Sequence, residues 1–121
     1  MPYLSVDARW SSQGVTILKD LKYPQGLVID ENDGKMYVAD SDTHRIVAVT
    51  IDHYNGNHGS AVAGDNEIGN SLIQLNRPTD VLIDNKTRSL IICDHGNNRI
   101  MRWSLESGTT TGEILINNII L

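Results

Sequence analysis

Two acid–base pairs with the same spacing stand out among the residues that could do chemistry. Asp40 precedes Arg45 by five residues, and Asp94 precedes Arg99 by the same distance. An Asp at the end of a strand accepts hydrogen bonds from turn N–H groups, and an Arg across a short loop can reach that carboxylate or nearby carbonyls. Because the pair occurs twice, we interpret it as a structural device needed once per repeat. The predicted structural motif residues are Asp30, Asp40, Arg45, Asp84, Asp94 and Arg99.

The four histidines and the single cysteine raise the question of a metal site. His53 and His58 lie in a stretch rich in Gly and Asn, while His44 and His95 occupy turn positions far apart in the chain. Zinc needs three or four convergent N, S or carboxylate ligands. Cys93 lies inside an apolar strand pattern, where it is interpreted as a small core residue. The sequence therefore predicts no metal and no other cofactor.

Other catalytic arrangements find no support in the sequence. No serine lies in a Gly-x-Ser-x-Gly turn, and the glycines do not form a phosphate-binding loop. Asp65 and Glu67 are acidic neighbours, which we interpret as a solvated patch in preference to a cation contact. We predict no catalytic residue and expect that the chain is not an enzyme.

An internal repeat organises the chain. Residues 21–50 and 75–104 align without a gap at an offset of 54, with seven identical pairs against about two expected from ordinary residue usage. Apolar residues stand opposite apolar residues at most other positions. Trp10 and Trp103 hold equivalent places in a further partial match, and their recurrence predicts packing between repeats.

Each repeat is predicted to contain four short strands. Asp33-Gly34 is a strong hairpin signal, whereas the second copy has Thr87-Arg88 there, so a different turn is expected. No window shows sustained helical periodicity, although a short helical turn is expected over 66–74. Four strands joined by short hairpins are the plan of a propeller blade. The expected strands are 26–30, 36–39, 46–49 and 60–63, with 113–116 as the counterpart of the last.

The spacing of 54 residues exceeds the roughly 40–50 residues that are usual for a blade. The excess falls in 53–74, which is interpreted as a long loop between blades. The predicted organisation is the end of a preceding blade at 1–20, a first repeat with its inter-blade loop at 21–74, and a second repeat with the start of the next strand at 75–121.

The two repeats resemble NHL repeats. That family's pattern is a Pro, an apolar strand ending in Asp, a second strand ending in Val-Ala-Asp, and then a polar residue followed by Arg-Ile. Here it reads Val38-Ala39-Asp40 with Arg45-Ile46, and Ile92-Cys93-Asp94 with Asn97-Asn98-Arg99-Ile100. The second copy departs from the first by Cys93 and by Asp80 in place of Gly26.

The resemblance implies a six-bladed β-propeller, of which this chain would supply about two and a half blades. The expected fold class is all-β, with antiparallel four-stranded blades that leave the propeller incomplete and open in this chain. Such a chain would be a fragment, a truncated product, or one part of a ring built from several copies. Unpaired strand edges would allow self-association.

The function expected is a non-catalytic module that binds a protein, peptide or other ligand through its turns and loops. The candidate contact residues are Asp42, His44, His95, Asn97 and Asn98, together with the loop over 53–74. One alternative is a fragment of a metal-dependent propeller enzyme, similar to peptidyl-hydroxyglycine lyases or lactonases. Another is the recognition domain of an NHL-containing protein similar to ubiquitin ligases.

Composition limits the partners and the compartment. The formal net charge is −5 and no basic run is present, which argues against nucleic acid because phosphate binding calls for a basic stripe. No apolar run has the length of a membrane span. One cysteine cannot form an internal disulfide, and residues 1–10 do not resemble a signal peptide. A cytoplasmic location is therefore expected.

Overall fold

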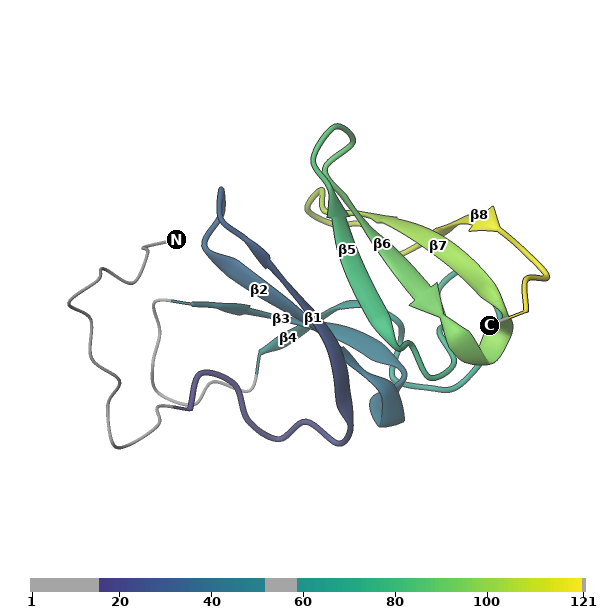
Figure 1. The fold of residues 1–121 in the computed structure, drawn as a ribbon, viewed down its shortest axis with the longest axis horizontal. Coiled ribbons are helices and arrows are strands. Elements are labelled where there is room, and N and C mark those ends of the chain that lie inside the picture. The colour runs from purple at the N-terminus through teal and green to yellow at the C-terminus, as the bar shows by residue number, and fades with distance from the viewer. Residues whose placement is uncertain (1–15, 52–58, 121) are drawn as a thin grey trace.

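The computed structural model describes residues 16–51 and 59–120, and these form two separate antiparallel sheets of four strands each (Figure 1). In each sheet the strands lie side by side in the order in which they follow along the chain. The described regular structure otherwise consists of two short 3-10 turns. The sheets do not close into a ring, and the all-β blade architecture predicted from the sequence is confirmed.

The first sheet follows the expected strands closely. It contains β1 (Pro24–Asp30), β2 (Lys35–Asp40), β3 (Arg45–Thr50) and β4 (Ser60–Ala63). The β1–β2 hairpin turns at the predicted Asp33-Gly34, where Gly34 adopts a φ of 64°. Glycine takes this left-handed conformation without the steric cost that a Cβ would add.

The second sheet repeats this plan with β5 (Asp80–Asp84), β6 (Ser89–Asp94), β7 (Arg99–Ser104) and β8 (Glu113–Ile116). The expectation of a different β5–β6 turn was wrong. Arg88 stands where Gly34 stands in the first sheet and takes the same left-handed conformation, with a φ of 47°. Its guanidinium donates to Asn85, Asp30 and Asp33, so side-chain contacts offset a backbone conformation that is costly for a residue with a Cβ.

The β2–β3 and β6–β7 connections are matching 3-10 turns, η1 (Ser41–Thr43) and η2 (His95–Asn97). Each turn ends on a non-glycine residue in the left-handed region, His44 with a φ of 55° and Asn98 with a φ of 52°. The four residues that separate each Asp from its Arg, 41–44 and 95–98, are therefore the residues that make the turn.

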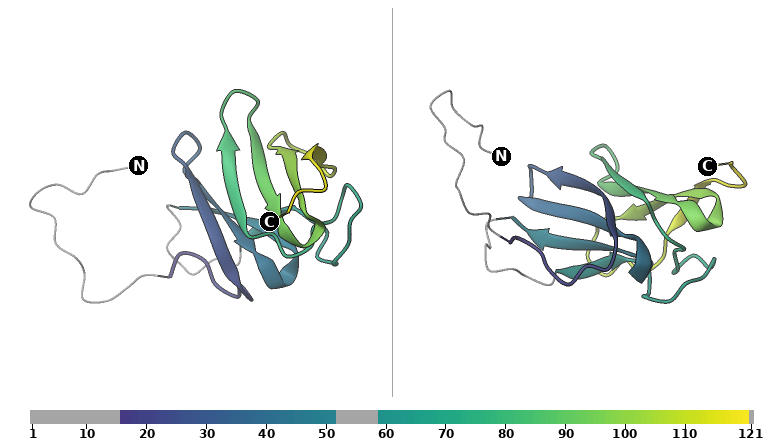
Figure 2. Two further views of the ribbon diagram at one scale, coloured as in Figure 1. Left: turned by 45° about the vertical axis from the view of Figure 1, so that its right-hand side comes forward. Right: turned by 60° about the horizontal axis from the view of Figure 1, so that its bottom comes forward.

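The core lies between the two sheets, which pack face to face (Figure 2). The first sheet contributes small and medium side chains such as Ala39 and Ala48, and the second contributes larger ones such as Met101 and Trp103. Trp103 is only 2% exposed within this core, so its predicted packing between repeats is confirmed, while Trp10 lies outside the described residues. Near β1, the backbones approach so closely that a Cβ on Gly26 would lie 2.8 Å from the Cα of Asp80.

Two local expectations were wrong. Residues 66–74 form no helix; they contain a turn in which Gln74 N–H donates to Ser71 at 3.2 Å, and Ile68 bridges to Leu75. Cys93 does not belong to the core between the sheets. It lies between Asp80 and Ile100 in the register of the second sheet, on the face turned away from the first sheet, and is half-buried. Within the described ranges, no helix is long and apolar enough to cross a membrane.

Candidate functional site

Asp94 is the centre of a buried polar network at the end of β6. Its carboxylate accepts hydrogen bonds from Asn76 N–H at 2.7 Å, Asn97 Nδ2 at 2.8 Å and Arg99 Nε at 2.7 Å. Both Asp94 and Arg99 are almost fully buried. A buried ion pair with further hydrogen bonds is costly to break, because removing one partner leaves the other charge uncompensated.

Arg99 also attaches the loop between the sheets to the second blade. Its two terminal nitrogens donate to the carbonyl groups of Asn70, Ser71 and Gln74, each at 2.9 Å. Asn97 adds a hydrogen bond to the Gly69 carbonyl at 2.8 Å. This loop follows β4 and leads into β5, so one arginine holds the connection that sets where the second blade begins.

Asp40 is placed equivalently in the first blade but has a different arginine contact. It accepts from the N–H groups of Lys22 and Tyr23 and from the Thr43 hydroxyl at 2.8 Å. Arg45 donates to Thr43 at 3.1 Å, so in the described contacts it is connected to Asp40 through that hydroxyl. The structural role of these aspartates and arginines stays a prediction.

The turn residues expected to contact a partner lie on one end of the two sheets. Asp42 in η1 pairs with Arg77 at 3.6 Å, and His44 Nδ1 accepts a hydrogen bond from Arg77 N–H at 3.1 Å. Ser41 donates its hydroxyl to the Pro78 carbonyl at 2.9 Å. The turn of the first blade is thus joined to the chain segment that enters the second.

The second turn joins the same segment from the other side. Gly96 N–H donates to the Asn76 carbonyl at 2.7 Å, and a side chain at Gly96 would collide with Asn76. His95 and Asn98 are exposed, while Asn97 is half-buried because it holds the inter-blade loop. We call the surface formed by residues 41–44, 76–78 and 95–98 the turn ridge.

The turn ridge contains residues that sequence reasoning missed. Arg77 lies between the two turns with its side chain 62% exposed, yet it belongs to neither of the expected contact loops. The repeat gave no signal for it, because the equivalent residue in the first copy is Tyr23. The remaining expected contact region, the loop over 53–74, lies partly outside the described residues.

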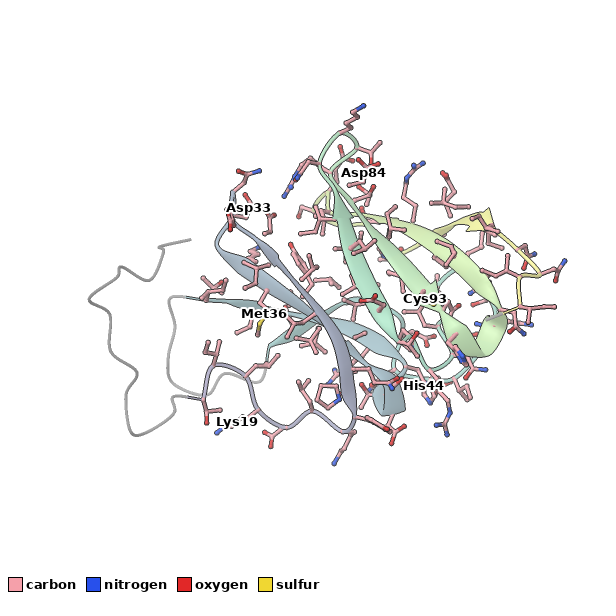
Figure 3. The ribbon with its side chains drawn as sticks, in the orientation of Figure 1. Lys19, Asp33, Met36, His44, Asp84 and Cys93 are labelled. Atoms are coloured by element: carbon pink, nitrogen blue, oxygen red, sulfur yellow. The ribbon has the colours of Figure 1, made fainter. Side chains whose placement is uncertain are left out.

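The opposite end of the sheets carries a second charged contact between blades. Arg88 donates to Asp30 at 2.6 Å and to Asp33 at 2.9 Å; Figure 3 shows Asp33 and Asp84 at this end and His44 at the other. Burial by itself raises the pKa of Asp30, but the hydrogen bond and charge of Arg88 with the N–H groups of Asn32 and Asp33 outweigh it and lower the pKa below 3.8. Burial and the nearby carboxylates raise the pKa of Tyr37 above 10.0.

Asp84 lies at the equivalent place in the second blade and has local partners. It accepts from Thr87 Oγ1 at 2.9 Å and from Lys86 N–H at 3.0 Å, and these hydrogen bonds lower its pKa. Arg102 lies 3.9 Å from Asp84 and 3.3 Å from Glu113. The two aspartates therefore differ, since Asp30 is paired across the blades and Asp84 within its own blade.

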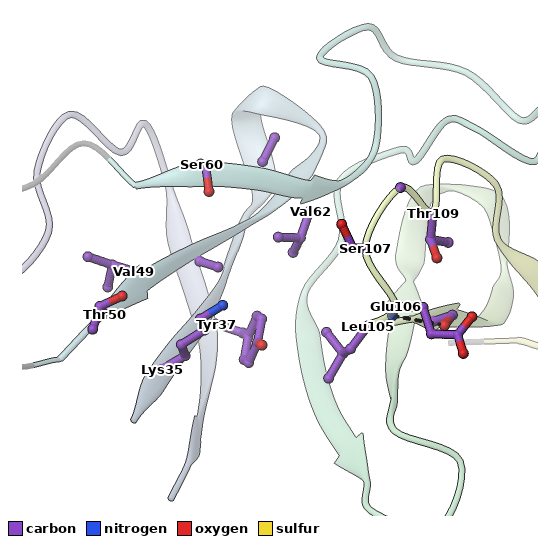
Figure 4. Close-up of a pocket in the computed structure, with 14 residues that line it drawn as sticks. Lys35, Tyr37, Val49, Thr50, Ser60, Val62, Leu105, Glu106, Ser107 and Thr109 are labelled. Atoms are coloured by element: carbon purple, nitrogen blue, oxygen red, sulfur yellow. Dashed lines mark hydrogen bonds between the residues drawn. The ribbon is translucent and has the colours of Figure 1, made fainter. Parts of the chain in front are cut away.

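A hollow of about 350 Å³ opens between the sheets near the β1–β2 end (Figure 4). Several hydroxyl groups line it together with Lys35, Tyr37, Leu105 and Glu106. A neighbouring hollow of about 330 Å³ is lined by Trp103, Thr109 and Thr110. The Trp103 indole nitrogen is buried and has no hydrogen-bond partner in the described part of the chain.

The acidic and metal-ligating side chains of the described residues are placed as follows. Among residues 16–51 and 59–120, no group of three or more His, Cys, Asp or Glu side chains is placed to hold a metal ion. Asp65 and Gln74 form an exposed contact at 3.4 Å, and Asp65 also accepts from Glu67 N–H. The aspartates that the sequence singles out accept hydrogen bonds from backbone N–H groups and from Thr, Asn or Arg side chains.

Comparison with known proteins identifies one part of the chain. Residues 21–48 match the model of the NHL repeat, a span that covers β1, β2, η1 and β3 as far as residue 48. The second sheet has the same strand order and the same turn, although the match does not extend to it. No curated protein matches the chain closely enough to count as a relative.

Proposed function

We propose that this chain, which carries an NHL repeat at residues 21–48, is a non-catalytic propeller-type module that binds a protein or peptide partner through the turn ridge. The repeat supports the coarser statement that the chain is a β-propeller-type repeat module. The resemblance further implies a six-bladed ring, to which the two sheets would contribute two neighbouring blades.

The observation that carries this proposal is the way the turn ridge is held. Its backbone is fixed by buried carboxylates and by contacts between the blades, whereas the side chains of Asp42, Arg77 and His95 project into solvent. A rigid backbone that presents exposed side chains loses little conformational entropy when it binds. Loops held by a rigid scaffold are also where binding residues most often occur.

The chemistry of the ridge favours a polar, mixed-charge partner. Asp42 carries a negative charge, and the positive charge of Arg77 lies 3.6 Å away. His44 accepts a hydrogen bond from Arg77 N–H, and His95 lies in the second turn of the ridge. An extended peptide segment offers carbonyl, N–H and charged groups that such side chains can pair with. None of the exposed large apolar side chains of the described residues belongs to the turn ridge.

Selection of peptides on the purified chain tests the proposal. Peptides would be selected from a displayed random library and then measured against a variant with Asp42→Ala, Arg77→Ala and His95→Ala. These side chains are exposed, and loss of the surface ion pair costs about 0–1 kcal/mol, so the variant is expected to stay folded. We expect the selected peptides to lose binding to this variant.

The matched control changes the other end of the sheets. A variant with Asn32→Ala, Lys86→Ala and Glu106→Ala also loses three exposed side chains and should bind the same peptides as the unmodified chain. Peptides that bind the ridge variant as well as they bind the unmodified chain would place the binding surface elsewhere and refute the proposal. Peptides whose binding is lost only in the control variant would refute it too.

A further inference from the structure

The hollow of about 350 Å³ between the two sheets contains no residue of the turn ridge. One wall comes from β2, β3 and β4 of the first sheet, and the other comes mostly from the connection between β7 and β8 (Figure 4). Small-molecule clefts in proteins measure about 300–1,000 Å³. The hollow therefore has the size of a site for a small ligand held between two blades.

The side chain of Tyr37 is a buried polar group that faces this hollow. Only 3% of the residue is exposed, and Figure 4 shows its ring directed from β2 toward Leu105 on the opposite wall. Its hydroxyl makes no hydrogen bond with another described residue. Most buried polar side-chain atoms have a partner, so this unpaired phenol marks a point at which a ligand group can bond.

The lining adds further groups that both donate and accept hydrogen bonds. Besides Tyr37, the hydroxyl side chains of the two walls are those of Thr50, Ser60, Ser104, Ser107 and Thr109. A hydroxyl donates one hydrogen bond and accepts up to two. Ser104 Oγ accepts from Glu106 N–H at 3.1 Å and keeps its own hydrogen to donate. Such a lining matches a ligand whose own groups also donate and accept.

The charges around the hollow favour a ligand without net charge. Lys35 on β2 and Glu106 on the facing connection line it with opposite signs, and both are exposed. Burial, Asp30 and Asp33 together raise the pKa of the phenol above 10.0, and Arg88 opposes them less strongly. The phenol is therefore protonated at neutral pH, and the same two carboxylates repel an anion placed beside it.

We propose that this hollow is a binding site for a small neutral polyhydroxyl ligand, a mono- or disaccharide. Ligand hydroxyls pair with the Tyr37 phenol and with the hydroxyl side chains of both walls, while Lys35 donates to them and Glu106 accepts from them. The C–H face of a sugar ring contacts the apolar part of the lining, which includes Val62 and Leu105. Because the site lies apart from the turn ridge, this inference does not depend on the proposed function.

Titration of the full chain, followed by NMR, tests the site. Amide signals of the isotope-labelled protein would be recorded with increasing glucose, galactose, N-acetylglucosamine, maltose or lactose. We expect at least one of these sugars to cause saturable shifts that are largest at the lining residues in 35–37, 60–62 and 104–109. No saturable shift with any of them would mean that the hollow holds only water and would refute the proposal. Saturable shifts centred on another part of the chain would refute it too.

Tyr37→Phe separates ligand binding from packing. It removes a hydroxyl that has no partner among the described residues, so the variant should be at least as stable to urea as the unmodified chain. Loss of one hydrogen bond to the sugar should weaken binding about two- to ten-fold. The matched control is Tyr23→Phe, because Tyr23 is 53% exposed and lies beside η1 at the other end of β1. Equal affinity of Tyr37→Phe and the unmodified chain, or an equal loss in both variants, would overturn the proposal.

Charged probes test the class of the ligand. Glycylglycine carries a positive and a negative charge at its ends, and acetate carries only a negative charge; neither has an alcohol hydroxyl. We expect neither probe to shift the signals of the hollow at the concentration at which the sugar saturates them. Saturable binding of glycylglycine that Glu106→Gln abolishes would identify a site for zwitterions, and saturable binding of acetate would identify an anion site. Either result would refute a polyhydroxyl ligand.

Discussion

At the scale of single residues, the carboxylates of Asp40 and Asp94 have the same place in the repeat but different hydrogen-bond partners. Asp94 is paired with the buried guanidinium of Arg99 at 2.7 Å. Asp40 instead accepts from two backbone N–H groups and a hydroxyl among its described partners. The same Asp–Arg spacing therefore produces one direct ion pair and one contact that passes through Thr43. The loss in free energy of unfolding on replacing each aspartate should therefore differ.

Replacing Asp94 should cost more stability than replacing Asp40. Asp94→Ala leaves the buried charge of Arg99 without its partner, and loss of one member of a buried ion pair costs about 3–5 kcal/mol. Asp40→Ala leaves neutral donors unsatisfied, which costs about 1–3 kcal/mol. Urea unfolding followed by circular dichroism measures both, and equal losses would contradict the distinction.

The contact between Asp30 and Arg88 predicts a dependence of stability on pH. The folded state holds the pKa of Asp30 below 3.8, so the unfolded chain takes up this proton more readily. The stabilisation is therefore full above pH 3.8 and is lost as the pH falls through the lowered pKa of the folded state. Arg88→Met keeps the aliphatic stem but removes the charge. We expect Arg88→Met to be less stable than the unmodified chain at neutral pH.

Urea unfolding across a series of pH values measures this difference. The gap between the unmodified chain and Arg88→Met should narrow as the pH drops below 3.8, because protonation removes the charge on Asp30. Arg77→Met is the control, since Arg77 pairs with the exposed Asp42 and should show a smaller effect. A gap that stays constant with pH would show that the charge of Asp30 is not involved.

At the scale of elements, the turns decide how each strand leads into the next. Gly64 follows β4 with a φ of 85°, and a Cβ there would collide with the His44 carbonyl oxygen. Gly108, in the β7–β8 connection, has a φ of 84° but nothing within 4 Å of the same point. The two glycines have the same backbone conformation and differ in their surroundings.

This pair separates backbone strain from packing. Gly108→Ala should cost about 1–2 kcal/mol, the strain of a left-handed residue that has a Cβ. Gly64→Ala should cost this and a further 1–3 kcal/mol or so for forcing the β2–β3 turn away from β4. Thermal and urea unfolding of the two variants gives the comparison. Equal losses of stability at Gly64 and Gly108 would show that the β2–β3 turn can shift away from β4 at no cost.

At the scale of the whole molecule, the two sheets are held together by a core to which each contributes one face. Small side chains of the first sheet, including Ala39 and Ala48, face larger ones of the second, including Met101 and Trp103. Complementary sizes allow the two faces to pack closely. Among the described residues, Trp103 is the largest of the fully buried side chains, so the stability of both sheets should depend on it.

Trp103→Ala should destabilise the chain by about 3–5 kcal/mol, the usual cost of removing a large buried aromatic side chain. Urea unfolding followed by far-ultraviolet circular dichroism reports on both sheets together. Ile120→Ala is the control, because Ile120 is fully exposed and its truncation should change little. A loss below about 1 kcal/mol at Trp103 would mean that the sheets are stable without their shared core.

Local patterns in the sequence determined the strands and the motif positions. Apolar runs between Pro, Gly and Asp residues predicted the strands to within one or two residues, and the gapless repeat predicted that both sheets share one plan. Strand pairing with the next strand in sequence needs only short hairpins, so this information is local. For the same reason the sequence alone could place Asp40 and Asp94, the residues at which the second strand of each blade leads into its turn.

Only the tertiary structure decided which surfaces meet. Arg77 lies beside Asp42, Arg88 lies beside Asp30, and Cys93 faces away from the core. The two arginine contacts join residues 35 and 58 positions apart, across a boundary whose geometry depends on how the two sheets pack. In a repeat, either face of a strand can be apolar, so periodicity alone does not say which face is turned toward the neighbouring blade. The packing of one sheet on the other makes that choice, and with it the turn ridge.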